Sequence, residues 1–328
     1  MKKILIVGGE GYIGRCLSEY FLRRKFDVTS FDNCIYGQSY KNKKKKIKNF
    51  TFIKGDILKD QDLNKIVKIK YDAIILLAGL VGDPITKKYK LLSKAINEKG
   101  ILKFIKKIYS VENSKKFIFI STCSNYGLSK SKFLSEKHKL KPLSLYAKSK
   151  VEIEKFILSL KKKNSFQPTI LRFATAFGFS ERMRYDLTIN QFVLEIYKKG
   201  FIEVYDYDTW RPYCHVKDFA RLIDKVILAK SVLTSYEIFN AGSNKNNFSK
   251  KNIAYKIKNK IGGKIILLKK SLDKRNYVVD FSKVKNVLNF EPKYTIEYGI
   301  NEILKNLKLE KNKNLKYSTF GNYKISNK

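Results

Sequence analysis

Short apolar runs alternate with amphipathic segments along the first half of the chain. The runs, rich in Ile, Val, Leu and Phe, occupy residues 3–7, 27–31, 50–54, 72–77, 116–121 and 168–173. Between them, helical spacing predicts helices ending near 25, at 60–69, at 89–110 and from Tyr146 to about 163. Strands that alternate with helices form a parallel sheet with both faces covered. The pattern therefore predicts an α/β fold with a doubly wound parallel sheet.

The alternation breaks after residue 175. We expect a polar loop at 180–186, a helix at 187–199, short strands at 202–205 and 236–240, and a helix at 217–230, followed by two or so helices and a strand within 249–310. This division predicts a first domain over 1–175, to which 212–240 returns, and a smaller mixed α/β cap made of 176–211 and 241–310. The Lys- and Asn-rich tail, 311–328, is expected to be poorly ordered.

The first apolar run leads directly into a glycine turn and a helix. The glycines fit Gly-x-Gly-x-x-Gly at 9, 11 and 14, and Gly-x-x-Gly-x-x-Gly at 8, 11 and 14. Such spacing occurs in ordinary tight turns, but after a first strand it lets the backbone approach a pyrophosphate at a helix N-terminus. The second run ends in Asp32, which is placed to bind an adenosine ribose and repel a 2′-phosphate. The order predicts a Rossmann domain that binds NAD rather than NADP.

Polar and glycine residues follow the other predicted strands as well. In parallel sheets, ligands collect beyond the carboxyl ends of the strands. Five strand ends should therefore meet at one crevice, namely those followed by Gly8, Asp32, Asp56, Ala78 and Ser121–Ser124.

Tyr146 and Lys150 stand four residues apart among helix-forming residues. A helix would present both side chains on one face. A phenol is nearly inert as a base at neutral pH, but a neighbouring ammonium lowers its pKa toward a useful range. The spacing is also common by chance in a lysine-rich chain, so the pair alone does not establish catalysis.

Taken in order, these motifs resemble those of the extended short-chain dehydrogenase/reductases, in particular the NAD-dependent epimerase/dehydratase family that acts on nucleotide sugars. The match runs from Gly8 to about Pro292. The resemblance implies Thr122, Tyr146 and Lys150 as catalytic residues. It implies cofactor contacts from Gly8, Gly11, Tyr12, Ile13, Gly14, Asp32, Asn33, Asp56, Ile57, Ala78, Gly79 and Lys150.

The implied chemistry is oxidation of a sugar hydroxyl to a ketosugar. Lys150 holds the nicotinamide ribose, and its charge lowers the pKa of Tyr146. Tyr146 removes the hydroxyl proton while Thr122 hydrogen-bonds the developing oxygen. The 4,6-dehydratases carry an Asp-Glu pair after the threonine, where this chain has Cys123 and Ser124. Dehydration is therefore disfavoured, and Cys123 is expected to be a packed residue rather than a catalytic thiol.

The predicted cap carries several arginines in a chain that otherwise uses lysine. Its segments resemble a subgroup of capsule and surface-polysaccharide enzymes that includes the C4 dehydrogenase of GDP-manno-heptose. The resemblance implies substrate contacts from Arg182, Arg184, Asn190, Arg211 and Arg275, with Arg211 and Arg275 holding the diphosphate. Surface charge is the alternative for Arg182 and Arg184. His215 is expected to order a turn and helix start rather than to shuttle protons.

Composition changes this picture little. The net charge of +40 comes mostly from lysines spread through every segment, which does not favour a nucleic-acid partner. The run Lys43–Lys46 is expected to be a solvated loop. The four cysteines show no metal or disulfide pattern, which fits a reducing cytoplasm, and no apolar run is long enough to cross a membrane.

The sequence leaves several functions open. The leading hypothesis is an NAD-dependent nucleotide-sugar epimerase or C4 dehydrogenase in surface-polysaccharide biosynthesis, with a homodimer implied by the resemblance. A 4,6-dehydratase or reductase is the alternative, and a non-catalytic NAD-sensing or RNA-binding protein is the alternative of a different class. The nucleotide base, the sugar and the carbon oxidised are not determined by these motifs.

Overall fold

The computed structural model describes residues 1–37, 48–112, 114–128, 133–163, 165–269, 275–310, 321–322 and 324–325. Lys43–Lys46, predicted as a solvated loop, lie outside these residues, as do positions 311–320 of the predicted tail.

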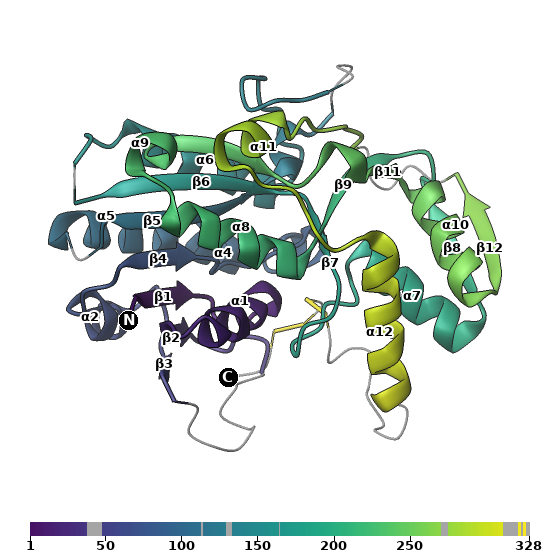
Figure 1. The fold of residues 1–328 in the computed structure, drawn as a ribbon, viewed down its shortest axis with the longest axis horizontal. Helices are drawn as coiled ribbons and strands as arrows, with labels where there is room; N and C mark the ends of the chain where they lie inside the picture. The colour runs from purple at the N-terminus through teal and green to yellow at the C-terminus, as the bar shows by residue number, and fades with distance from the viewer. Residues whose placement is uncertain are drawn as a thin grey trace.

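Seven parallel strands form the central sheet. They are β1 (Lys3–Val7), β2 (Asp27–Asp32), β3 (Phe50–Lys54), β4 (Ala73–Leu76), β5 (Lys116–Thr122), β6 (Gln167–Phe173) and β10 (Glu237–Ala241). Their order is β10-β6-β5-β4-β1-β2-β3 (Figure 1). The chain reverses its direction of travel across the sheet between β1 and β4, and ligand crevices open at such a point. The predicted doubly wound parallel sheet is confirmed.

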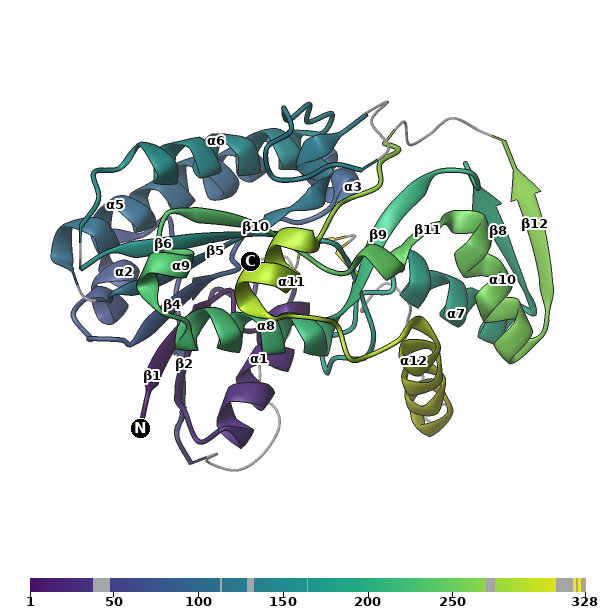
Figure 2. The same cartoon turned by 45° about the horizontal axis from the view of Figure 1, so that its top comes forward.

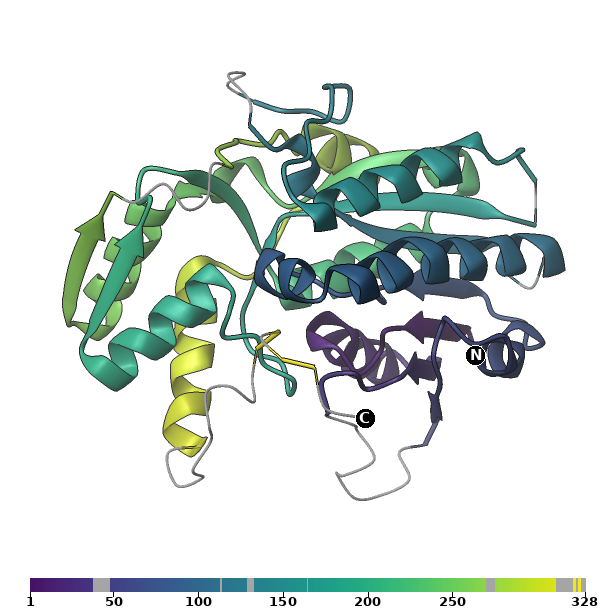
Figure 3. The same ribbon diagram turned by 180° about the vertical axis from the view of Figure 1, so that it is seen from behind.

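Alternating side chains of the strands face two separate cores. Ile4 and Ile6 pack with α1 (Tyr12–Arg23) and α8 (Val216–Leu228), whereas Leu5 and Val7 pack with α2 (Asp60–Val67), α5 (Ile101–Val111) and α6 (Leu145–Ser159). Figure 1 shows the face covered by α1 and α8, and Figure 3 shows α5 and α6 covering the opposite face. Burial on both faces explains why the strands are continuously apolar.

The single helix predicted at 89–110 is divided. It consists of α4 (Lys90–Lys94), a π-helical turn η2 (Ala95–Gly100) and α5, with α3 (Asp83–Lys88) before it. Within the turn, the Asn97 side chain bonds both the N–H and the C=O of Leu80, which follows β4. A π-turn re-aims one side chain within a helix, and periodicity cannot locate it. Here it fixes the loop that follows β4.

The cap is a second body with its own core. It contains α7 (Thr188–Lys199), β8 (Phe201–Tyr205), α10 (Lys250–Ile261), β12 (Lys264–Leu268) and α12 (Ile296–Glu310). Figure 2 shows β8 and β12 side by side at the outer edge, and they pair in parallel. A small sheet that the sequence did not predict, β11 (Asn247–Ser249), β9 (Trp210–His215) and β7 (Thr175–Phe177), connects the two bodies.

Two parts of the predicted division differ in the structure. Residues 276–290, predicted within the cap, include α11 (Ser282–Leu288) and bury Tyr277, Val279 and Phe281 in the core shared with Ile4. The apolar spacing of this segment predicts burial but not which of two cores receives it.

The tail, predicted to be poorly ordered, is buried at Gly321 and Asn322. Figures 1 and 3 show this short yellow trace between the two bodies. None of the helices in the described ranges is long and apolar enough to cross a membrane.

Candidate active site

A cavity of about 1100 Å³ opens at the carboxyl ends of the strands, between the sheet and the cap. Ordinary ligand pockets measure roughly 300–1,000 Å³, so this one has room for two large ligands. Of the predicted site residues, those on its wall are Gly8, Gly11, Tyr12, Ile13, Gly14, Asp32, Asn33, Ile57, Ala78, Gly79, Thr122, Tyr146, Lys150, Arg182, Arg184, Arg211 and Arg275. Asp56 and Asn190 are not among the lining residues.

The glycine turn after β1 has no room for side chains. Gly8 has φ +90°, and a Cβ there would lie 2.6 Å from the backbone nitrogen of Ala78. A Cβ on Gly14 would lie 2.5 Å from the carbonyl oxygen of Gly8. Gly11 caps α1 without a side-chain hydrogen bond. The turn thus presents backbone and a helix N-terminus to the cavity, which fits the pyrophosphate of a dinucleotide.

Asp32 ends β2 with its carboxylate fixed by the backbone. Oδ1 accepts from the N–H of Cys34 at 2.7 Å, and Oδ2 accepts from the N–H of Glu10 at 3.0 Å. Burial raises the pKa of Asp32 to about 6, against the two backbone hydrogen bonds, which lower it. The carboxylate is held in one orientation at the place predicted for a ribose.

Asp56 does not line the cavity, and its carboxylate is hydrogen-bonded to neighbouring residues instead. Its Oδ1 accepts from the N–H of Leu58 at 2.9 Å, and its Oδ2 accepts from Asn33 Nδ2 at 3.3 Å. The neighbouring Ile57 does line the cavity. Asp56 therefore orders the turn after β3, and through Asn33 the turn after β2.

Helix α6 places Tyr146 and Lys150 on the cavity wall. It starts at Ser144, whose Oγ accepts from the N–H of Ala147 at 3.2 Å. Lys150 Nζ donates to the carbonyl oxygen of Ile120 at 2.8 Å and lies 5.9 Å from the centre of the Tyr146 ring. It also lies 4.5 Å from the centre of the Phe119 ring. Both side chains are thus presented on one face of the helix.

The sequence predicts that Lys150 lowers the pKa of Tyr146, but Lys150 is not among the main influences on that pKa. Burial is the largest influence and raises the pKa of Tyr146, and the main charge opposing it belongs to Arg184. Burial also lowers the pKa of Lys150 to about 7, opposed by the charge of Glu154. A lysine that is only partly protonated near neutral pH is a weak activator.

A buried ion pair that the motifs did not reveal lies behind these residues. Glu154 Oε2 accepts from Arg172 at 2.7 Å, and both side chains are 3% exposed. Glu154 also accepts from Asn125 at 2.8 Å and from the Ser121 hydroxyl. One signal could have found it, because Glu154 stands four residues after Lys150 on the same helix.

Thr122 ends β5 and caps the turn that follows it. Its Oγ1 accepts from the N–H of Ser124 at 3.1 Å and lies 2.5 Å from the Ser124 hydroxyl. Cys123 points away from the cavity, is 1% exposed and donates to the carbonyl oxygen of Arg172. Burial raises its pKa. The prediction that Cys123 is a packed residue is confirmed.

Three of the four predicted substrate arginines are buried, which argues against surface charge, whereas the Arg275 side chain is 24% exposed. Arg182, Arg184 and Arg211 are 2%, 8% and 5% exposed. Arg184 pairs with Asp186, and Arg275 NH1 lies 2.9 Å from Asp83 Oδ2. Arg182 stacks over the Tyr36 ring, and Arg211 stacks over the Tyr277 ring, with centroid distances of 4.6 and 5.0 Å. Four guanidinium groups thus converge on one cavity.

Asn190, predicted as a substrate ligand, is fully buried behind that wall. Its Oδ1 accepts from the N–H of Gly178 at 3.0 Å, and its Nδ2 donates to Arg184 O at 3.1 Å and to Tyr12 Oη at 3.2 Å. These contacts correct the prediction: Asn190 holds the arginine-bearing loop against the glycine turn.

His215 begins α8 as predicted. Its Nδ1 accepts from the N–H of Lys217 at 3.2 Å, and its Nε2 lies 3.1 Å from Glu302. Within the described ranges, no group of three or more His, Cys, Asp and Glu residues could hold a metal ion.

Comparisons with known proteins identify the family and agree with the fold. Residues 4–242 match the model of the NAD dependent epimerase/dehydratase family. The chain is 30% identical to an uncharacterized protein of Methanocaldococcus jannaschii, over 91% of this chain and 94% of that one. It is 28% identical to the UDP-glucuronate 4-epimerase of Thermodesulfobacterium geofontis, over 90% and 93%.

Solved structures share the fold. The Thermotoga maritima UDP-glucose 4-epimerase with UDP-glucose has a TM-score of 0.80 at 21% identity, covering 94% of this chain and 99% of that one. The Bacillus anthracis dTDP-glucose 4,6-dehydratase with NAD has a TM-score of 0.81 at 24% identity, covering 95% and 98%.

Proposed function

Since the chain belongs to the NAD-dependent epimerase/dehydratase family, we propose that it oxidises a sugar hydroxyl of a nucleotide-diphosphate sugar, as an epimerase or a C4 dehydrogenase. The observation that carries the proposal is the placement of Thr122, Tyr146 and Lys150 on one wall of a cavity bounded by a glycine turn and four arginines. A non-catalytic NAD-sensing or RNA-binding protein would not require these three groups together.

The cofactor side of the cavity is formed by the sheet. Gly8, Gly11, Tyr12, Ile13 and Gly14 would hold the pyrophosphate of NAD, and Asp32 and Asn33 its adenosine ribose, beside Ile57, Ala78 and Gly79. Bound NAD supplies a hydride acceptor and a positive charge beside Tyr146.

The chain's own residues handle the proton and the developing charge. Tyr146 as phenolate takes the proton of the sugar hydroxyl, and Thr122 Oγ1 hydrogen-bonds the oxygen as it becomes a carbonyl. Lys150, held by the carbonyl oxygen of Ile120, would orient the nicotinamide ribose, and it favours the phenolate when it is protonated. The product of this half-reaction is a ketosugar. In an epimerase Tyr146 then returns the proton.

The arginines on the cavity wall suit the other half of the ligand. Arg211 and Arg275 are planar donors on the cap side of the cavity and would hold a diphosphate bidentately, with Arg182 and Arg184 nearby. Removing guanidinium charge from this wall would weaken the binding of any nucleoside diphosphate.

We propose surface-polysaccharide biosynthesis as the setting and a homodimer as the assembly.

Epimerisation or net dehydrogenation is favoured over dehydration. Water elimination requires an acid and a base close to the sugar, and the residues after Thr122 are the buried Cys123 and the hydroxyl of Ser124. The UDP-glucuronate 4-epimerase relative, which aligns over nearly its whole length, supports the epimerase alternative.

Replacing the proposed base tests the function. Tyr146→Phe should lower turnover of UDP-glucose, UDP-glucuronate or GDP-mannose, whichever the wild type accepts, by about 100- to 10,000-fold. NAD retained through purification, measured by mass spectrometry, should be unchanged. Tyr255→Phe, at an exposed position on α10, is the matched control. A Tyr146→Phe enzyme with near wild-type turnover would falsify the assignment.

Absorbance of NADH separates the two activities. An epimerase returns hydride to the ketosugar and shows only transient reduction, whereas a dehydrogenase accumulates NADH unless an acceptor is added. Accumulation with one sugar nucleotide would favour the C4 dehydrogenase.

A further inference from the structure

Arg182 is a buried cation with almost no partner in the protein. The residue lies on the cavity wall and is 2% exposed. Among the described residues its one hydrogen bond runs from NH2 to the carbonyl oxygen of Gly321, at a long 3.5 Å. Arg184 pairs with Asp186, whereas no carboxylate of the described residues lies within ion-pair distance of Arg182. Burying a charge without a partner is costly, so a buried cation on a ligand cavity indicates an anion supplied by the ligand.

The free donor atoms of Arg182 are Nε and NH1, and they open onto the cavity. Neither donates a hydrogen bond to a described residue, and neither belongs to the unpaired polar atoms that the described residues seal from solvent. Because the residue lines the cavity, the accessible surface of these atoms lies on it. A guanidinium with free donors suits the oxygens of a phosphate group.

The loop that carries Arg182 is attached to the glycine turn. Ser180 Oγ donates to the carbonyl oxygen of Tyr12 at 2.7 Å, and Tyr12 Oη donates to the carbonyl oxygen of Gly178 at 2.6 Å. Tyr12 is the first residue of α1, directly after Gly11. The loop therefore lies against the helix N-terminus at which a pyrophosphate is expected.

The side chain of Arg182 extends to the loop after β2. Its guanidinium lies over the Tyr36 ring, 4.6 Å from the ring centre. Burial lowers the pKa of Arg182 to about 10 and raises that of Asp32 to about 6, and in each case the charge of the other side chain opposes the shift. Arg182 thus lies between the places predicted for the pyrophosphate and for the adenosine ribose of the cofactor.

Two other arginines have their partners in a different part of the cavity. Arg211 stacks over the Tyr277 ring at 5.0 Å, and Arg275 NH1 lies 2.9 Å from Asp83 Oδ2. These partners belong to the segment before α11 and to the start of α3, not to the glycine turn or the loop after β2. The arginines can therefore serve two diphosphates, one in each part of the cavity.

We propose that Arg182 binds the diphosphate of the dinucleotide cofactor rather than that of the sugar nucleotide. The glycine turn offers a helix N-terminus to this diphosphate, and Arg182 adds a positive charge from the cap. The inference rests on the proposed function, because it assumes that a dinucleotide and a sugar nucleotide share the cavity. It moves Arg182 from the substrate to the cofactor, while Arg211 and Arg275 keep their assignment.

The test compares full-length Arg182→Gln and Arg182→Lys with wild type. Gln removes the charge, and Lys keeps it without the planar guanidinium. Arg211→Gln is the same change at the proposed substrate diphosphate, and Arg23→Gln is the control, because that side chain is 82% exposed on α1. For each protein we would measure NAD retained through purification, the dissociation constants of NAD and NADP, that of UDP or GDP at saturating NAD, and the melting temperature without ligand.

Loss of a charged hydrogen bond should weaken NAD binding by about 10- to 100-fold in Arg182→Gln and by less in Arg182→Lys. UDP or GDP binding should stay at the wild-type level, and Arg211→Gln should show the reverse pattern. Weaker UDP or GDP binding, with NAD binding unchanged or weakened equally, would overturn the inference. A loss confined to NADP would also overturn it, since the guanidinium would then bind a 2′-phosphate.

Thermal stability separates a ligand contact from a structural one. Removing a buried charge that has no carboxylate partner should leave the melting temperature of the ligand-free protein unchanged or raise it. A lower melting temperature for Arg182→Gln together with wild-type NAD affinity would show a purely structural contact and overturn the inference.

Failure of the proposed function would look different. If the wild type binds NAD but oxidises none of the sugar nucleotides, the activity proposal fails, and the NAD dissociation constants of the Arg182 variants still decide the inference. If the wild type is active and Arg182→Gln binds NAD as tightly as wild type, only the inference about Arg182 fails.

Discussion

Lys150 is a buried charge whose energetic effect depends on pH. Its side chain is 3% exposed, and burial lowers its pKa to about 7, from an ordinary value near 10.5. Between these values the unfolded chain binds more protons than the folded one, so this residue's contribution to stability rises with pH and is lowest below about pH 7. The ligand-free enzyme thus carries a destabilising residue at neutral pH, which a functional role would explain.

Lys150→Met should therefore stabilise the ligand-free protein near neutral pH. The free energy of unfolding should rise by at most about 5 kcal/mol, which is the size of the shift in the Lys150 pKa. Loss of the hydrogen bond to the carbonyl oxygen of Ile120 reduces this gain. Urea unfolding at about pH 7 and about pH 10 measures it, and the gap between variant and wild type should narrow at the higher pH. Lys148→Met, at an exposed position on the same helix, should show no such pH dependence. A gap independent of pH would contradict the depressed pKa.

Helix α6 is fixed to the sheet by the ion pair of Glu154 with Arg172 on β6. Removing one member of a buried pair leaves an uncompensated charge, which typically costs about 3–5 kcal/mol. Glu154→Gln keeps the shape and should lower the free energy of unfolding by roughly that amount. Glu152→Gln is the control, because its pair with Lys155 is more than 60% exposed on both sides and should matter by less than about 1 kcal/mol.

Equal free energies of unfolding for Glu154→Gln and Glu152→Gln would show that the buried pair contributes no more to stability than the exposed one. A second readout is functional, because Glu154 is the charge that raises the pKa of Lys150. Glu154→Gln should therefore lower the pKa of Lys150 further and shift any activity limb due to that lysine to lower pH.

At the scale of helices and strands, local sequence patterns predicted which elements form the site, but not where the helix at 89–110 is interrupted or which loops meet. The glycine turn, β2 ending in Asp32 and the α6 pair all follow from short-range spacing, which depends on backbone geometry alone. The π-helical turn at Asn97 and the partners of Asn190 depend on loops brought together by the fold. Nothing in the neighbouring residues encodes those contacts. The sequence could therefore single out Asn190, but not show that its side chain bonds to the surrounding loops rather than lining the cavity.

In the whole molecule, too, local patterns could not predict how segments far apart in the sequence pack together. The parallel sheet was predictable because apolar runs repeat along the chain. The return of 276–290 to the first core and of Asn322 to the cavity depends on which surface remains uncovered after the sheet and cap form. A polar, lysine-rich tail resembles a disordered one in composition even when one of its residues, Asn322, lines the cavity.

Glu302 on α12 makes several polar contacts with the start of α8 and the segment before it. Its carboxylate accepts from the N–H of Phe179 at 2.9 Å, from Lys217 Nζ and from His215 Nε2. Because His215 Nδ1 already accepts from the Lys217 N–H, the proton of the neutral ring belongs on Nε2. These donors outweigh burial and lower the pKa of Glu302 to about 2, from 4.5. The contact therefore stabilises the junction between the two bodies while Glu302 is ionised.

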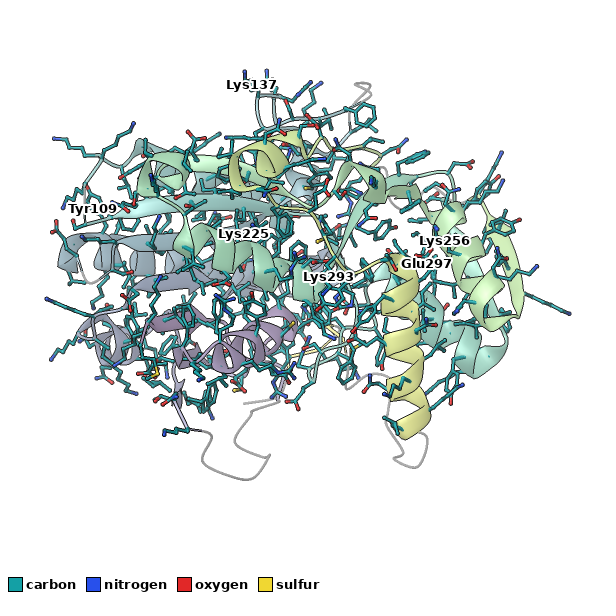
Figure 4. The ribbon with its side chains drawn as sticks, viewed as in Figure 1. Tyr109, Lys137, Lys225, Lys256, Lys293 and Glu297 are labelled. Carbon is teal, nitrogen blue, oxygen red and sulfur yellow. The ribbon has the colours of Figure 1, made fainter. Side chains whose placement is uncertain are left out.

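Glu302→Gln should thus destabilise the protein by about 3 kcal/mol near neutral pH, from the size of this shift. The stabilisation is complete above the ordinary pKa and is lost as pH falls through the folded value, so the gap to wild type should narrow below about pH 4.5. The matched control is Glu297, which lies on α12 like Glu302; Figure 4 shows it beside Lys256 of α10, with which it forms a 2.7 Å pair whose side chains are 35% (Lys256) and 49% (Glu297) exposed. Glu297→Gln should change unfolding in urea by less than about 1 kcal/mol. If Glu302→Gln behaves like Glu297→Gln at neutral pH, apolar packing rather than this carboxylate joins the cap to the sheet.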